Sequence, residues 1–117
     1  MFNGSHVIIY SEDAEADRAF LRDALGLPNV DTGGGWLIFK LPPAEIAVHP
    51  TDGAARHEFY FMCSDLTETL GELTAAGAQV TSPPVEQRWG VVAEIALPSG
   101  ARLGVYQPKH ELAYNLV

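Results

Sequence analysis

The sequence has one cysteine, few basic residues and no long apolar run, and each shortage excludes a class of protein. Cys63 alone cannot form an internal disulfide, so we expect it to be a small buried hydrophobic residue on a strand. Seven basic and fifteen acidic residues give a net charge of −8, which disfavours nucleic acid and anionic membranes as partners. Apolar residues make up 47% of the chain but are too interrupted for a membrane span. The first residues lack the basic start and apolar stretch of a secretory signal, so we expect a cytoplasmic protein.

What the chain does contain is a near-repeat. The stretch LPPAEIAVHP at residues 41–50 resembles LPSGARLGVYQP at residues 97–108. Upstream of each lie an alternating strand, an acidic helix start and a helix end at glycine, Gly26 and Gly77. A long period of this kind is typical of supersecondary units that share one core. The sequence therefore predicts a single domain over 1–117, with module one at 1–50, a linker at 51–55, module two at 56–108 and a tail at 109–117.

Hydrophobic periodicity and turn residues predict a β-α-β-β-β order in each module. Module one is expected to contain a strand at 5–10, a helix at 13–25, and strands at 30–32, 36–41 and 45–49. Module two is expected to contain a strand at 57–63, a helix at 65–76, and strands at 79–81, 91–97 and 101–106. The fold class is α+β, with a curved mixed sheet around a concave pocket and both helices on the outer face.

Strand alternation assigns residues to the two faces of this sheet. The face toward the helices is expected to carry Val7, Ile9, Leu37, Phe39, Leu41, Ile46, Val48, Phe59, Phe61, Ala93, Ile95, Leu97, Leu103 and Val105. The other face mixes aromatic rings and methionine with a few charged groups, which is unusual for a surface that only meets water. We interpret it as a ligand pocket, lined by Trp36, Lys40, His49, Tyr60, Met62, Glu94, Arg102 and Tyr106.

The chain resembles the vicinal oxygen chelate superfamily, which includes glyoxalase I, bleomycin-resistance proteins and extradiol dioxygenases. The resemblance covers nearly the whole chain and lies in the residues that begin and end its helices, strands and turns. Its carriers are His6-Val-Ile-Ile-Tyr with Asp13, Ala19-Phe20-Leu21 with Leu25-Gly26-Leu27, Asp65-Leu66 with Leu73 and Ala76-Gly77, and Leu97-Pro98-Ser99-Gly100 with Leu103. It implies the two-module fold, but fold alone does not determine function.

The resemblance also implies where a metal would bind. In metal-using members the first and last strands of each module each supply one ligand, typically His, Glu or Gln. In this sequence the first strands place His6 and Glu58 at those positions, whereas the last strands place Ala47 and Gly104 there. Methyl and hydrogen side chains offer no lone pair to a metal. We therefore expect no cofactor, although a divalent metal on His6, Glu58 and His49 is an alternative, because two histidines and a carboxylate suit such ions.

Other interpretations of these residues stay open at the level of sequence. His6 and Glu58 form a hydrogen-bonded pair or an acid–base dyad, since a nearby carboxylate raises a histidine pKa. The rings of Trp36, Tyr60 and Tyr106 either stack on a planar or cationic ligand or pack in a dimer seam. Glu94, Lys40 and Arg102 either recognise polar groups of a ligand or form a solvated rim.

The sequence leads to two functional hypotheses. The first is a protein that binds a small organic molecule without the full metal site, as an accessory or sequestering protein. The alternative is a metal-dependent glyoxalase-like lyase or isomerase, or a dioxygenase, that uses His6 and Glu58, with His49 as the candidate third ligand. Which compound is bound is left open. Proteins of this resemblance pair to close the pocket, and a large apolar face on a small domain favours burial against a partner, so we expect a homodimer.

Overall fold

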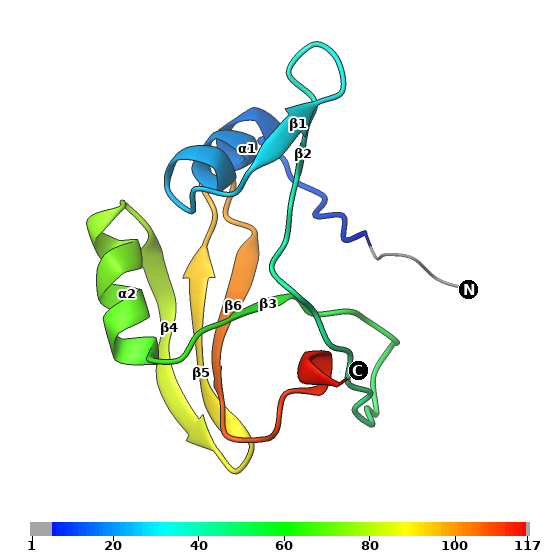
Figure 1. The fold of residues 1–117 in the computed structure, drawn as a ribbon, viewed down its shortest axis with the longest axis vertical. Coiled ribbons are helices and arrows are strands. Elements are labelled where there is room, and N and C mark those ends of the chain that lie inside the picture. The colour runs from blue at the N-terminus through cyan, green and yellow to red at the C-terminus, as the bar shows by residue number, and fades with distance from the viewer. Residues whose placement is uncertain (1–5, 117) are drawn as a thin grey trace.

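The computed structural model describes residues 6–116. Within that range it contains two α-helices, six strands and one short 3₁₀ helix (Figure 1). Their order is α1 (Ala14–Asp23), β1 (Asn29–Asp31), β2 (Leu37–Phe39), β3 (Tyr60–Met62), α2 (Leu66–Ala75), β4 (Gln79–Gln87), β5 (Gly90–Ala96), β6 (Arg102–Pro108) and η1 (Ala113–Asn115). Residues 60–108 thus follow the predicted order of strand, helix and three strands.

Two separate sheets form from these strands. The larger has the order β3-β6-β5-β4, in which β3 runs parallel to β6 and the other neighbours are antiparallel. The smaller is the antiparallel hairpin β1-β2. The α+β class with an open, curved mixed sheet is therefore confirmed. The expected short strand at 79–81 is longer, because β4 continues through Pro83-Pro84 with shifts of register on either side of Ser82.

Both helices begin at the predicted caps, and α1 ends two residues before the expected residue 25. Asp13 caps α1 by accepting a hydrogen bond from the Ala16 amide at 3.1 Å, and Asp65 caps α2 through the Glu68 amide at the same distance. Each helix is followed by a glycine with positive φ, Gly26 at 66° and Gly77 at 98°. The two helices therefore share the same type of N-cap and the same glycine after the C-terminus, as the sequence repeat suggests.

The core lies between the helices and the larger sheet. Ala93, Ile95, Leu97, Leu103 and Val105 are buried on the predicted side of β5 and β6, against Leu66 and Leu70 of α2. Phe20 and Leu21 of α1 and Phe59 and Phe61 around β3 pack on the same cluster, and Cys63 is partly buried beside it. Burial raises the pKa of the Cys63 thiol, which favours its inert neutral form.

Module one differs from the prediction in its first and last strands. Within the described range, residues 6–10 and 41–50 form no ladder with a neighbouring strand (Ser5 lies outside the described residues). Ile46 and Val48, expected under the helices, are 91% and 93% exposed, and Val7 is 48% exposed, whereas Ile9 reaches the core. The alternation of residues predicts which side chains share a face, but a strand also needs a neighbouring strand edge with which to form hydrogen bonds. Pro42, Pro43 and Pro50 have no amide proton to donate to such an edge.

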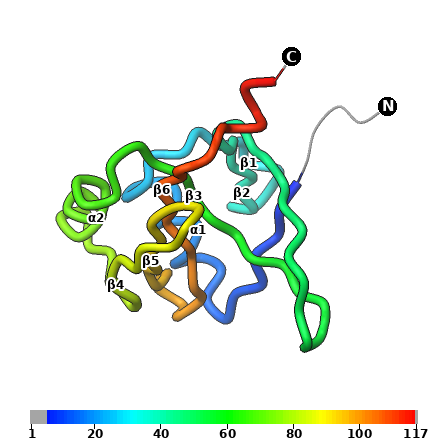
Figure 2. The backbone as a smooth tube through the Cα atoms, turned by 90° about the horizontal axis from the view of Figure 1, so that it is seen from below, coloured from blue at the N-terminus to red at the C-terminus, as the bar shows by residue number. Residues whose placement is uncertain are grey.

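The unpaired segments lie on the side of the molecule away from α2. Figures 1 and 2 both show the connection from β2 to β3 looping out there before it returns to the larger sheet. The C-terminal η1 lies beside this connection in Figure 1, where the Ala113 amide donates to Glu45 at 2.8 Å. Across the described residues, no helix is long and apolar enough to cross a membrane.

Candidate functional site

The sheet register brings several of the predicted pocket residues into two adjacent rows. In one row Tyr60 of β3 lies opposite Gly104 of β6, and Gly104 lies opposite Glu94 of β5. In the next row Tyr106 lies between Met62 and Val92. Side chains of one parity share a face, so these residues stand on the side of the sheet opposite the helices, as the sequence predicts.

Three aromatic residues meet on this surface, which we call the aromatic face: Tyr60, Trp89 and Tyr106. The ring centroid of Tyr106 is 5.2 Å from that of Trp89 and 6.2 Å from that of Tyr60, both in edge-on geometry. The Tyr106 hydroxyl donates to the Trp89 carbonyl at 3.1 Å. Tyr106 is buried, whereas Trp89 is 40% exposed and can contact a ligand.

Of the ionisable groups at this site, the Tyr60 phenol has the most strongly shifted pKa. Its hydroxyl donates a short hydrogen bond of 2.5 Å to Oε2 of Glu58, and Oε1 of Glu58 lies 3.5 Å from Nη2 of Arg56. Burial, the hydrogen bond to Glu58 and the charges of Glu58 and Glu94 together raise the pKa of Tyr60 to about 12. The phenol therefore keeps its proton throughout the physiological range.

A second polar group flanks the same row. Oε1 of Glu94 accepts hydrogen bonds from the Thr81 hydroxyl at 3.0 Å and from Nη1 of Arg102 at 3.1 Å. Because these groups are only partly buried, the ion pair adds little to stability, but it orients the carboxylate next to Tyr60.

Two histidines border the aromatic face. The ring of His49 lies 6.3 Å from that of Trp89, and the ring of His110 lies 5.8 Å from that of Tyr106. Nε2 of His110 is 3.7 Å from Oε1 of Glu45, the same carboxylate that receives the Ala113 amide. The tail thus joins module one at the edge of the aromatic face, and the charge of Glu45 adds to burial in raising the pKa of Tyr106.

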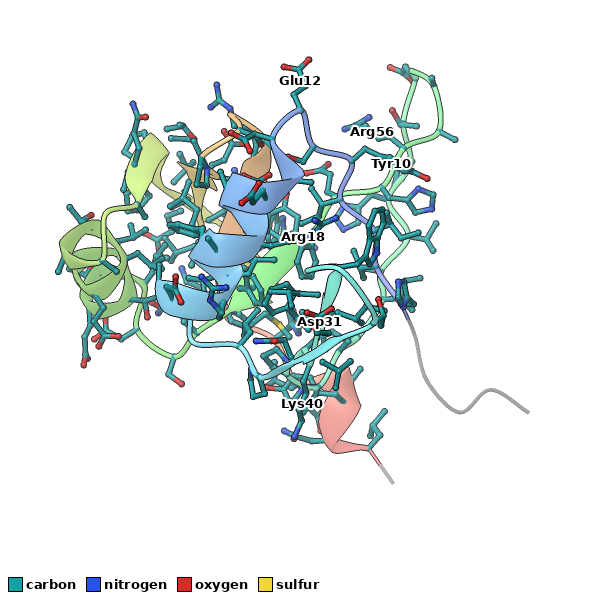
Figure 3. All side chains as sticks on the ribbon, turned by 90° about the horizontal axis from the view of Figure 1, so that it is seen from above. Tyr10, Glu12, Arg18, Asp31, Lys40 and Arg56 are labelled. Atoms are coloured by element: carbon teal, nitrogen blue, oxygen red, sulfur yellow. The ribbon has the colours of Figure 1, made fainter. Side chains whose placement is uncertain are left out.

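Three predicted site residues, Trp36, Lys40 and His6, lie away from the aromatic face. Trp36 is 63% exposed in the hairpin, and the Arg18 guanidinium of α1 lies 4.5 Å from its ring centroid. Figure 3 shows Arg18 on α1 and Lys40 on the hairpin side of the molecule, while Tyr10 and Arg56 lie on the outer segments. His6 is exposed, and in the described chain Glu58 pairs with Tyr60 and Arg56 rather than with His6.

The residues present do not fit the metal site that the resemblance implies. A Cβ atom at Gly104 would stand 2.0 Å from Cδ1 of Tyr60, so the ring already fills the space beside this position. Glu58 is engaged by Tyr60 and Arg56, and Ala47 lies in the unpaired segment. The described residues contain no group of three or more His, Cys, Asp or Glu side chains that could hold an ion.

Sequence reasoning missed Trp89, His110 and Glu45. Trp89 sits in the turn between β4 and β5, where strand parity does not apply. His110 shares the parity of Tyr106 and Pro108, so extending the alternation past β6 would have found it. Nothing in the sequence indicates that Glu45 contacts the tail, because that contact joins residues 68 positions apart.

Two hollows lie outside the aromatic face. One, of about 280 Å³, is lined by Tyr10, Ser11, Glu12, Ser99, Gly100 and Ala101. The other, of about 410 Å³, lies between α1 and the end of α2, with Pro98 at its edge. Neither includes any residue of the aromatic face.

No family model and no curated protein matches this sequence. Solved structures do match over nearly the whole chain. An antibiotic-binding protein, TnmS3, from a Streptomyces species is 21% identical, with a TM-score of 0.62, over 93% of this chain and 100% of that one. A lactoylglutathione lyase from Agrobacterium tumefaciens is 22% identical, with a TM-score of 0.61, over 89% and 94%. A Sphaerobacter thermophilus member of the glyoxalase/bleomycin resistance protein/dioxygenase superfamily is 21% identical, with a TM-score of 0.60, over 91% and 96%. This chain therefore has the fold of the glyoxalase/bleomycin resistance/dioxygenase superfamily, as the sequence resemblance predicted.

Proposed function

We propose that this protein binds a small organic molecule on the aromatic face and does so without the four-ligand metal site of the superfamily's enzymes. The observation that carries the proposal is the meeting of Tyr60, Trp89 and Tyr106 beside oriented carboxylates, which offers ring faces and hydrogen-bond acceptors together. The likeness to an antibiotic-binding protein supports binding as the role. The net charge of −8 supports a small-molecule partner rather than nucleic acid or an anionic membrane, in a cytoplasmic protein.

A ligand screen tests this proposal. The chain has two tryptophans, so Trp36→Phe leaves Trp89 as the single fluorescent reporter in the aromatic face. We expect at least one compound in a panel of small aromatic and aliphatic molecules to raise the Tm and to quench Trp89. Tyr60→Ala should abolish both effects. The proposal would be contradicted if no compound in the panel binds, or if Tyr60→Ala leaves the affinity of the bound compounds unchanged.

The metal-dependent alternative rests on the likeness to a lactoylglutathione lyase. It requires an ion on His6 and Glu58, with His49 as the candidate third ligand, whereas in the described chain Glu58 pairs with Tyr60 and Arg56. Elemental analysis of the purified protein separates the two functions. One equivalent of a tightly held divalent metal, lost in His6→Ala, would favour the enzyme over the binding protein.

We also propose that the protein is a homodimer. The segments of module one that belong to no strand in the described range expose Ile46, Val48 and Ile8, the last at 63%. Exposed apolar strand residues of this kind favour pairing with a second copy. We expect light scattering to give a dimer mass, and Ile46→Lys with Val48→Lys to give a monomer. Val85→Lys, on the outer strand β4, is the matched control and should leave the dimer intact; a natural chain that stays monomeric at every concentration would refute this assembly.

A further inference from the structure

Gly104 is the residue of β6 on which the ring of Tyr60 lies. A Cβ atom added there would stand 2.0, 2.4 and 2.8 Å from Cδ1, Cε1 and Cγ of that ring. The φ angle of Gly104 is not positive, so its backbone conformation is open to any residue. A side chain at position 104 is therefore excluded by the Tyr60 ring and not by the backbone conformation.

Glu58 holds the other end of the same side chain. The phenol proton is committed to Oε2 of Glu58 at 2.5 Å, so the hydroxyl oxygen presents lone pairs rather than a donor. Oε1 of Glu94, across Gly104 in the same row, is already engaged by Thr81 and Arg102, so Glu94 contributes its negative charge rather than this oxygen. The charges of both carboxylates act on the Tyr60 phenol and together outweigh the opposing Arg56.

We propose that Gly104 is a positioning residue that seats Tyr60, and that Tyr60 with Glu58 recognises a flat aromatic ligand bearing an N–H donor. This inference rests on the proposed function and names its ligand class. It also gives a physical reason for the misfit with a metal site. The Tyr60 ring lies between Glu58 and Gly104, the two positions that the superfamily resemblance assigns to ligands in module two. A phenol ring and its acceptors thus take the place of an ion.

A fluorescence titration with carbazole tests the ligand class, with 9-methylcarbazole as the equally neutral and flat probe that lacks the N–H group. We expect carbazole to bind more tightly than 9-methylcarbazole to the natural protein. Tyr60→Phe keeps the ring and removes the hydroxyl, so it should weaken carbazole binding by about tenfold and erase the preference. Gly104→Ala should weaken it by a similar factor, because the added methyl group displaces the ring.

Gly71→Ala is the matched control, since a Cβ atom at this exposed helical position meets nothing within 4 Å. It should bind both probes as the natural protein does. A second readout separates positioning from folding. Ultraviolet titration should show the Tyr60 phenol, identified by its absence in Tyr60→Phe, ionising at lower pH in Gly104→Ala, because the displaced ring becomes more exposed.

The outcomes distinguish this inference from the proposed function. If other compounds bind the aromatic face but Gly104→Ala and Tyr60→Phe leave the affinity for carbazole unchanged, the inference is wrong and the binding function stands. The same holds if only 9-methylcarbazole binds. If Zn(II) binds tightly to the natural protein and is lost in Glu58→Gln, the metal site exists and the inference falls.

Discussion

We expect Leu103→Ala to lower the free energy of unfolding by about 3 kcal/mol. Leu103 lies at 1% exposure in β6, the strand between β3 and β5 that carries Gly104 and Tyr106 on its other face. The loss combines the transfer of a buried side chain with the cavity left behind, because packed neighbours relax only partly. For a domain of this size the Tm should fall by roughly 10 °C.

Leu116→Ala provides the control for this prediction, since it removes the same atoms from a side chain that is 73% exposed. Urea denaturation followed by circular dichroism measures both variants. We expect Leu116→Ala to match the natural protein. Equal destabilisation of the two variants would mean that β6 does not lie at the centre of the core. A smaller loss at Leu103 alone would mean that the cavity collapses around it.

The second large effect is expected at Asp17, a buried carboxylate on α1 at 5% exposure. Its Oδ1 accepts from the Ser99 amide at 2.9 Å and its Oδ2 from the Ser99 hydroxyl at 2.7 Å, across 82 residues of sequence. These bonds fasten α1 to the turn between β5 and β6. Because hydrogen bonds to a charged group are strong and their loss leaves Ser99 unsatisfied, Asp17→Ala should cost about 2–4 kcal/mol.

Two further variants test the reason given for Asp17. Asp23→Ala, at the exposed end of the same helix, removes an ion pair with Arg22 at the surface and should change stability little. Of the two bonds to Asp17, Ser99→Ala removes only the one from the hydroxyl, so it should lower the free energy of unfolding by part of the amount expected for Asp17→Ala. The double variant should lose less stability than the sum of the two single variants, because both single changes break the same contact. Additive losses in thermal denaturation would show that the two residues act independently.

The sequence by itself determined the parts of this protein that depend on neighbouring residues. Helix ends were predictable because Asp13, Asp65, Gly26 and Gly77 act on backbone groups within a few positions. Module two was predictable because its alternation matches a ladder that forms, which buries Ile95 and Val105 and leaves Tyr60 and Tyr106 on the opposite face. The fold class followed from the repetition of these signals.

Tertiary structure alone decided the rest of the site and of module one. The segment with Ile46 and Val48 reads as a strand, yet pairing depends on a partner edge that alternation does not encode. The contact of the Tyr60 ring with Gly104 depends on how β3 and β6 align in register, which no local pattern records. Trp89 and Glu45 join the site through contacts with residues far along the chain, and such contacts exist only once the chain has folded.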